Sequence, residues 1–380
     1  MEYVNLDKLV WFQEGPGVRN YQYVDKGIKL INVTNLVNGK LKLHLTNRFI
    51  SEEEANGKYK HFMCDIGDLV IASSGITYDT LDKKIAFVTE KDLPLCMNTS
   101  VIRFKPLDNN VCLDFIYYFF KSKKYKNQIS KLMTGSAQLN YGPSHLHKVK
   151  IPLYNFDKQL KIATELKKID SIILICHNNL ENLDNIVKSR FIEMFGRIND
   201  SIYDISEIVD LCEFVKDGTH QTPTYTDDTI NGYKFLSSKD VTSGKIDWSN
   251  INFIPEELHE KLYKTIKPQR NDILLAKNGT TGTAALVETD DVFDIYVSLA
   301  ILRFKQGNNP KYMLYAINND DTKEQFNGSL KGVGVPNLHL GEIKKTKLIV
   351  PPIELQNKFV EFVEQIDKSK YSGGVGYAIC

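Results

Sequence analysis

The sequence predicts an α+β fold in which two homologous domains are each followed by a helix suited to pairing. Three observations predict this fold. The same order of short motifs occurs twice, about 200 residues apart in a chain of 380 residues. Short runs of Val, Ile, Leu and Phe, separated by Gly, Asn and Asp, are typical of strands. A long apolar heptad pattern follows the first copy, which indicates a helix of a coiled coil.

The repeated motifs keep their order along both copies. The matched segments are Lys29–Val33 with Lys234–Ser238, Gly67–Ala72 with Asn271–Ala276, Val101–Lys105 with Ile301–Lys305, a Tyr-rich helical segment after each of these, QLNYG with VPNLHLG, and KIPLY with LIVPPIEL. Each copy therefore predicts one mixed domain of roughly 150 residues. We expect the first domain at 1–152, the first long helix at 153–195, the second domain at 196–352, a short second helix at 353–372 and a tail at 373–380.

The first helix carries an apolar seam at alternating steps of three and four residues. Its members are Ile162, Leu166, Ile169, Ile173, Cys176, Leu180, Leu183 and Val187, and the second helix repeats the start of the seam with Phe359, Val363 and Ile366. A helix over Asp157–Phe195 would be about 55–60 Å long, which exceeds what one small domain needs. The pattern therefore indicates a spacer as well as a pairing surface.

Bulk composition excludes several classes of protein. The formal charge is only +1, so any nucleic-acid surface must be local. The six cysteines never form a CxxC pair, which argues against a zinc knuckle or a disulfide framework. The start of the chain lacks a signal-peptide pattern, and the longest aliphatic run, Ile172–Cys176, is too short to span a bilayer, so we expect a cytoplasmic protein.

Catalytic motifs are also missing from the sequence. It contains no NPPY-like tetrapeptide for amino-group methylation, no GxxxxGK[ST] phosphate loop and no HExxH metal helix. We therefore expect no catalytic residue, no metal and no cofactor.

The order of domain, long helix, domain and helix resembles the DNA-specificity subunits of type I restriction-modification enzymes. The resemblance rests on GDLVIASSG with NDILLAKNGTTG, SVIRFK with AILRFK, the pre-helix elements that contain Gln159 and Gln356, the KKID and EQID helices, and DGTHQTP at Asp217–Pro223. It implies a non-catalytic subunit with two target-recognition domains, each of which reads one half of a split, asymmetric DNA site. It also implies that the two helices pack antiparallel as a ruler on which two methyltransferase subunits dock, with restriction subunits completing the enzyme.

Base reading requires polar side chains on loops, while Lys and Arg contact phosphates. Candidate DNA-binding residues in the first domain are Arg19, Ser73, Ser74, Thr77, Tyr78, Lys83, Lys84, Gln138, Asn140 and Tyr141. Those in the second domain are Thr219, His220, Gln221, Thr222, Lys239, Lys277, Asn278, Thr280, Thr281, Asn337 and His339. The same loops could simply make tight turns, and His339 could cap a helix. Divergent loops between matching strands favour the DNA-reading interpretation.

The second helix departs from the family pattern because Gly373 and Gly374 end it early. We therefore expect the distal part of the first helix, with Leu180, Leu183, Val187 and Phe191, to lack a partner in the chain and to favour self-association or another subunit. The competing function is a duplicated coiled-coil scaffold that binds proteins and reads no DNA, and a free-standing enzyme is a third interpretation.

Overall fold

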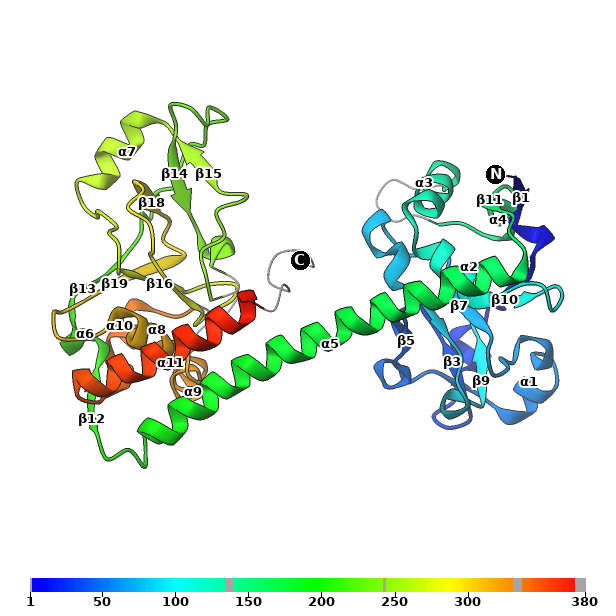
Figure 1. Cartoon of the computed structure of the whole chain (residues 1–380), viewed down its shortest axis with the longest axis horizontal. Coiled ribbons are helices and arrows are strands. Elements are labelled where there is room, and N and C mark those ends of the chain that lie inside the picture. The colour runs from blue at the N-terminus through cyan, green and yellow to red at the C-terminus, as the bar shows by residue number, and fades with distance from the viewer. Residues whose placement is uncertain (1, 134–139, 242–243, 331–336, 373–380) are drawn as a thin grey trace. The chain divides into compact units, whose positions relative to one another are not determined.

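The computed structural model describes residues 2–133, 140–241, 244–330 and 337–372. Its internal contacts divide the chain into unit 1, Met1–Leu174, and unit 2, Ile175–Cys380. Each unit mixes helices with small sheets (Figure 1). Among the described residues, no helix is long and apolar enough to cross a membrane.

Unit 1 is built on a four-stranded antiparallel sheet of order β2-β10-β7-β8 and a three-stranded sheet of order β6-β3-β9. Its strands are β1 (Tyr3–Asn5), β2 (Val10–Glu14), β3 (Ile28–Ile31), β4 (Leu36–Val37), β5 (Lys40–Leu41), β6 (Phe49–Ile50), β7 (Leu69–Ala72), β8 (Ile85–Phe87), β9 (Leu95–Met97), β10 (Val101–Pro106) and β11 (Lys150–Pro152). Its α-helices are α1 (Glu52–Asn56), α2 (Leu113–Lys121), α3 (Lys123–Leu132), α4 (Pro143–Leu146) and the first part of α5 (Phe156–Phe195).

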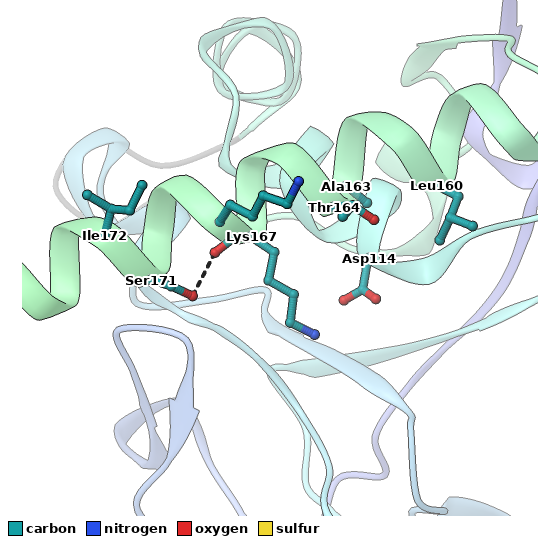
Figure 2. A pocket seen from close by; sticks show the side chains of 8 residues that line it. Asp114, Leu160, Ala163, Thr164, Lys167, Ser171 and Ile172 are labelled. Carbon is teal, nitrogen blue, oxygen red and sulfur yellow. Dashed lines mark hydrogen bonds between the residues drawn. The ribbon is translucent and has the colours of Figure 1, made fainter.

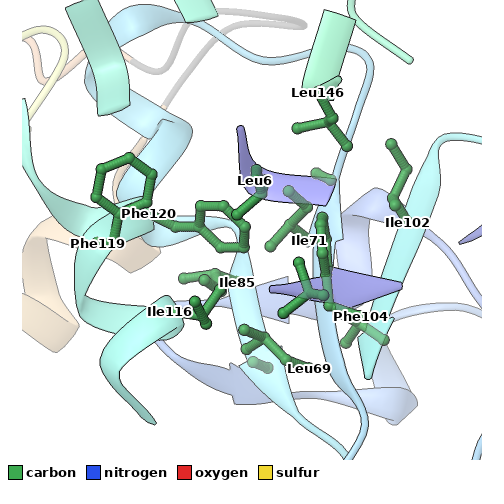
Figure 3. Close-up of a cluster of buried hydrophobic side chains, with 14 of the residues drawn as sticks. Leu6, Leu69, Ile71, Ile85, Ile102, Phe104, Ile116, Phe119, Phe120 and Leu146 are labelled. Atoms are coloured by element: carbon green, nitrogen blue, oxygen red, sulfur yellow. The ribbon is translucent and has the colours of Figure 1, made fainter. Parts of the chain in front are cut away.

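The core of unit 1 lies between the four-stranded sheet and α2. Leu69, Ile71 and Phe104 point from the strands toward Ile116 and Phe120 of the helix (Figure 3). β7 is buried on both faces, which explains its unbroken run of apolar residues. The strand and helix patterns of this copy are thereby confirmed.

Unit 2 repeats the strand order of the four-stranded and three-stranded sheets of unit 1, but the β4-β5 pair of unit 1 has no counterpart among its described strands. Its sheets have the orders β13-β19-β16-β17, β15-β14-β18 and β12-β20. The strands are β12 (Asp204–Glu207), β13 (Cys212–Asp217), β14 (Tyr233–Leu236), β15 (Asn252–Ile254), β16 (Ile273–Ala276), β17 (Ala284–Leu286), β18 (Phe293–Ile295), β19 (Leu299–Phe304) and β20 (Lys347–Val350). The helices are the last part of α5, α6 (Ile208–Leu211), α7 (Glu256–Tyr263), α8 (Pro310–Asn318), α9 (Asp320–Gly328), α10 (Leu340–Lys345) and α11 (Ile353–Ser372).

The repeat extends to single residues. The equivalent strands β7 and β16 each follow a residue with a left-handed backbone. This residue is Gly67 at φ +86° in unit 1 and Asn271 at φ +74° in unit 2. Asn tolerates this conformation better than other residues with a side chain, so it can replace the glycine. The next residue is a buried aspartate that pairs with a cation on β10 or β19, as in the 2.7 Å bridge between Asp272 and Arg303.

A buried glutamine fixes the first turn of each long helix. Gln159 and Gln356 are each 1% exposed. The side-chain Oε1 of these residues accepts from the backbone N–H of Cys112 and Asn309, at 3.0 and 2.9 Å. Each Nε2 donates to a carbonyl just before the helix, at 2.8 and 2.9 Å. The same side chain therefore ties each helix to its own unit.

The expectation that the distal part of α5 lacks a partner in the chain is wrong for Val187 and Phe191. Val187 and Phe191 are each only 4% exposed, in the core of unit 2. The Phe191 ring contacts Phe359 of α11 edge-on, with centroids 5.4 Å apart, and stacks on Tyr312 of α8 at 5.7 Å. The heptad spacing in the sequence shows that α5 has an apolar stripe. It does not show that the stripe is buried by two helices together, α8 and α11.

Within unit 2, α11 runs antiparallel to the last part of α5. Phe359 lies beside Phe191 near the start of α11, and Lys370 near its end bridges Asp184 at 2.8 Å, earlier in α5. The short second helix therefore pairs with the distal part of α5. The predicted tail at 373–380 lies outside the described residues.

Candidate nucleic-acid interface

The candidate site in each unit begins where β7 or β16 ends. These strands are fully apolar and buried, and the residues that follow them turn polar at once. Because the two strands occupy the same place in equivalent sheets, the loops after them occupy equivalent places as well. The loop sequences differ, SSGITYD in unit 1 and KNGTTG in unit 2.

A polar pair anchors the buried first residue of each loop. In unit 2, Lys277 is 5% exposed and its Nζ lies 2.6 Å from Oδ1 of Asp217 on β13. In unit 1 the matching residues are Ser73 and Glu14, and the serine hydroxyl donates to the carboxylate at 3.4 Å. An ion pair in one copy thus replaces a neutral-to-charged hydrogen bond in the other.

The segment before α4 or α10 closes over the loop in both units. The backbone N–H of Tyr141 donates to the Ser73 carbonyl, and that of Leu338 donates to the Lys277 carbonyl, at 2.9 and 3.0 Å. In unit 1, Asn140 Oδ1 also accepts from the backbone N–H of Gly75 at 3.2 Å. Tyr141 and Leu338, which lie in the repeated segments, therefore hold the loops of the two units through equivalent backbone hydrogen bonds.

The loop of unit 2 contains unusual buried oxygens. Within the described part of the chain, Asn278 Oδ1, Thr281 Oγ1 and Asn337 Oδ1 are buried without a hydrogen-bond partner. A buried acceptor left unpaired costs about 1–3 kcal/mol, and such groups concentrate at functional sites. Among the described residues, this loop therefore leaves more buried polar atoms without a hydrogen-bond partner than the SSGITYD loop of unit 1 does.

The predicted residues fall into three groups by exposure. The exposed ones are Arg19, Thr77, Tyr78, Lys83, Asn140, His220, Gln221, Thr222, Lys239, Thr280 and His339. The half-buried ones are Ser74, Lys84, Thr219, Asn278, Thr281 and Asn337. Ser73, Tyr141 and Lys277 are buried and bonded inside their units, and Gln138 lies outside the described residues.

Unit 2 brings four of the predicted segments together. His220 Nε2 lies 3.6 Å from Asp217 Oδ2, on the carboxylate that also holds Lys277. Thr280 Oγ1 donates to the carbonyl of Val241 at 3.4 Å, next to the turn that carries Lys239. The loops around residues 217–222, 238–241, 277–281 and 337–339 thus form one surface.

Fewer direct contacts connect the predicted residues of unit 1. Tyr78 OH donates to Asn127 on α3 at 2.7 Å, and the Lys84 ammonium donates to the carbonyl of Val33 at 3.3 Å. No hydrogen bond or ion pair among the described residues joins Arg19 to the loop of Ser73–Tyr78. His339 is the N-cap residue of α10, but its side chain makes no capping hydrogen bond.

Sequence reasoning missed a buried His–Asp pair beside this surface. His259 Nδ1 lies 2.6 Å from Asp294 Oδ2, and the Tyr233 ring stacks on the imidazole at 3.7 Å. Burial raises the pKa of Asp294, and the neighbouring histidine lowers it in part. Asp294 also lines a 140 Å³ cavity together with Asp217 and Thr219. Cys96 takes the equivalent register in unit 1, so the repeat gives no signal for this pair.

Comparisons with known proteins agree with this architecture. The sequence model described as "Type I restriction modification DNA specificity domain" matches residues 20–185 and again 203–372. The type I restriction enzyme MjaVIII specificity subunit of Methanocaldococcus jannaschii is 28% identical over 49% of this chain and 43% of the relative, so this chain spans less than half of that protein. The MjaIX specificity subunit of the same organism is 24% identical over 74% of this chain and 68% of the relative.

A solved structure described as the structural basis of complex assembly and conformational transition of the type I restriction-modification system matches in fold. It has a TM-score of 0.54 at 13% identity and covers 98% of this chain and 91% of its own. Because the family model matches both units over most of their lengths, the chain belongs to the type I restriction modification DNA specificity domain family and carries two copies of that domain.

Proposed function

We propose that this chain is the non-catalytic DNA-specificity subunit of a type I restriction-modification enzyme. Each unit reads one half of a bipartite, asymmetric DNA site. The single observation that carries the proposal is that equivalent sheets present different exposed loops at the same place. A shared framework with divergent polar loops is what two readers of different half-sites require.

The exposed residues of the loop surfaces are the proposed base and phosphate contacts. In unit 2 these include His220, Gln221 and Thr280, and in unit 1 Thr77 and Asn140. Their side chains can donate to or accept from base edges in the major groove. Ser73, Tyr141 and Lys277 instead hold the loops in place, because their polar atoms are used inside the units.

The helices supply the spacing in this proposal. Over its 40 residues, α5 is about 60 Å long, and α11 pairs antiparallel with its distal part. We propose that this helix framework sets the unread gap between half-sites and is where two methyltransferase subunits dock. Restriction subunits then join the methyltransferase complex to form the nuclease.

The test is to co-express the chain with the adjacent methyltransferase in a methylation-free host and to map methylated adenines by sequencing. The expected result is one bipartite motif with a fixed gap. His220→Ala should change the bases recognised in one half only, while the matched control His177→Ala, an exposed histidine on α5, should leave the motif unchanged.

The competing scaffold function predicts a different outcome. A protein-binding scaffold would yield no sequence-selective methylation, and the chain with its methyltransferase would bind no DNA selectively at any salt concentration. A DNA reader should lose affinity steeply as salt rises, because each neutralised phosphate releases counterions. Methylation or cleavage by the isolated chain would contradict the non-catalytic assignment.

A further inference from the structure

Unit 1 has surfaces that the proposed base contacts leave unused. One is a groove of 730 Å³ lined by Asp114 of α2 and by residues of α5 from Leu160 to Ile172 (Figure 2). It lies on the helix framework, to which the proposed function already assigns a role. The other is the loop of residues 15–27 after β2, which carries the exposed side chains of Arg19 and Tyr21. This loop has no role so far.

The loop after β2 leaves the sheet beside the loop after β7. Both strands run antiparallel to β10, so their last residues lie at the same edge of the sheet. The backbone N–H of Gly15 donates to the Val101 carbonyl at 2.9 Å, and that of Ser73 donates to the Ser100 carbonyl at 2.8 Å. The two loops therefore begin next to each other, where the proposed base contacts of unit 1 begin.

The equivalent loop of unit 2 already holds proposed base contacts. The backbone N–H of Gly218 donates to the first carbonyl of β19 at 3.2 Å, just as Gly15 donates to that of β10. A Cβ on either glycine would lie only 2.1 or 2.3 Å from a backbone carbonyl oxygen, so only glycine fits there. His220 and Gln221 follow Gly218 closely, and Arg19 follows Gly15 closely, so these residues occupy equivalent parts of the two loops.

The loop of unit 1 is anchored on both sides of Arg19. Val18 is 6% exposed and packs in a core cluster with residues of β3 and β6. Gln22 accepts from the backbone N–H of Arg19 at 3.0 Å and donates to Glu54 at 2.6 Å. Tyr21, between these anchors, is 85% exposed. The backbone is therefore held in place before any ligand binds, which lowers the entropy lost on binding.

The guanidinium of Arg19 is available to a ligand. No hydrogen bond or ion pair within the described parts of the chain uses it. Its rigid fork of donors matches the O6 and N7 acceptors of guanine in the major groove. The surroundings are not a basic patch, because Gln22 ties the loop to α1, whose first turn carries Glu52, Glu53 and Glu54. This charge pattern favours a base contact over a phosphate contact.

We propose that Arg19 reads a guanine in the half-site of unit 1, and that Tyr21 contacts the sugar–phosphate backbone beside it. The inference rests on the proposed function, because it requires unit 1 to bind DNA. It goes further by assigning a G·C pair to one position of that half-site. Tyrosine hydroxyls commonly donate to phosphates, which fixes register without reading sequence.

The first experiment maps methylation after co-expression of Arg19→Ala with the methyltransferase. One G·C position in one half of the motif should lose its preference by about 10–100-fold, while all other positions stay the same. Lys8→Ala is the charge-matched control, because Lys8 is exposed and lies before the opposite end of β2. It should leave the motif unchanged, and so should Tyr21→Phe.

The two levels of the hypothesis fail in different ways in this experiment. Absence of any bipartite motif with the unaltered chain would contradict the proposed function itself. A normal motif that Arg19→Ala leaves intact would overturn only the assignment of Arg19. A uniform loss of affinity with a smaller salt dependence and an unchanged motif would indicate a phosphate contact, and it would overturn guanine reading as well.

The second experiment measures binding of the chain with its methyltransferase to duplexes that carry deazaguanine, in which carbon replaces N7, at the position assigned to Arg19. The analogue should weaken binding of the unaltered chain by about 10-fold and should leave binding of Arg19→Ala unchanged, because its partner is already gone. A folding defect in the variant would weaken binding to both duplexes alike without removing this difference. Equal sensitivity of both proteins to the analogue would overturn the proposal.

Discussion

The buried glutamine at the start of each long helix offers the sharpest test of the duplicated framework. Gln159→Leu keeps nearly the same volume but removes the acceptor of the Cys112 N–H and the donor to the carbonyls of Tyr154 and Asn110. An unpaired buried donor costs about 1–3 kcal/mol, and the carbonyls lose a partner too, so we expect unit 1 to lose about 2–4 kcal/mol of stability.

The two tryptophans allow each unit to be followed separately. Trp11 lies on β2 of unit 1, and Trp248 packs edge-on against Phe293 in unit 2. In a Trp248→Phe background, Gln159→Leu should lower the urea midpoint of the Trp11 signal by roughly 1–2 M, given a slope near 2 kcal/mol/M.

The mirror-image experiment tests the same reasoning in unit 2. In a Trp11→Phe background, Gln356→Leu should lower the Trp248 midpoint by a similar amount, because Gln356 bonds Asn309 and Pro351 in the same way. Gln365→Leu, at an exposed position of α11, is the matched control. The anchoring role is refuted if either buried substitution shifts its midpoint no more than the control does.

Three further predictions follow from the described contacts. Lys277→Ser should destabilise unit 2 by about 1–3 kcal/mol in urea unfolding, since it leaves the half-buried carboxylate of Asp217 without its ion-pair partner, and adding Asp217→Ser should recover part of the loss. At pH 8, iodoacetamide should label the half-buried Cys176 but not the buried Cys64. Burial raises the pKa of Cys64 to about 12, which leaves roughly one thiolate in ten thousand at pH 8, so its reactivity should rise only as the pH approaches 12. Labelling of Cys64 in the native protein at pH 8 would contradict its burial. Inserting one heptad after Leu180 should lengthen the unread DNA gap by about 3 base pairs in the methylation map, and an unchanged gap would contradict the ruler.

The architecture was predictable because repetition is visible without any structure. Equivalent motifs in one order predict equivalent strands, and the sheets of the two units do agree in order and register. A helix after each domain was also predictable, since the apolar spacing that starts at Ile162 lies in α5 and the one that starts at Phe359 lies in α11.

The site was less predictable, because residue type does not reveal exposure. Lys277 has a side chain that could contact a phosphate, but its ammonium pairs with Asp217 on β13 inside the unit. Tyr141 is likewise buried, and its hydroxyl donates to the Ala72 carbonyl at 2.8 Å. These partners lie about 60–70 residues away in sequence, beyond the reach of any local pattern.

The polar pair at the start of each loop differs between the units, and this difference constrains how a protein with this scaffold can change its DNA target. Moving from Ser73 with Glu14 to Lys277 with Asp217 requires two substitutions far apart in the chain, and losing the lysine alone leaves the half-buried carboxylate of Asp217 without its ion-pair partner. Recombination that exchanges a whole unit transfers both partners at once and avoids the destabilised intermediate. New specificities in this scaffold should therefore arise by shuffling complete units more readily than by stepwise change at the loop base.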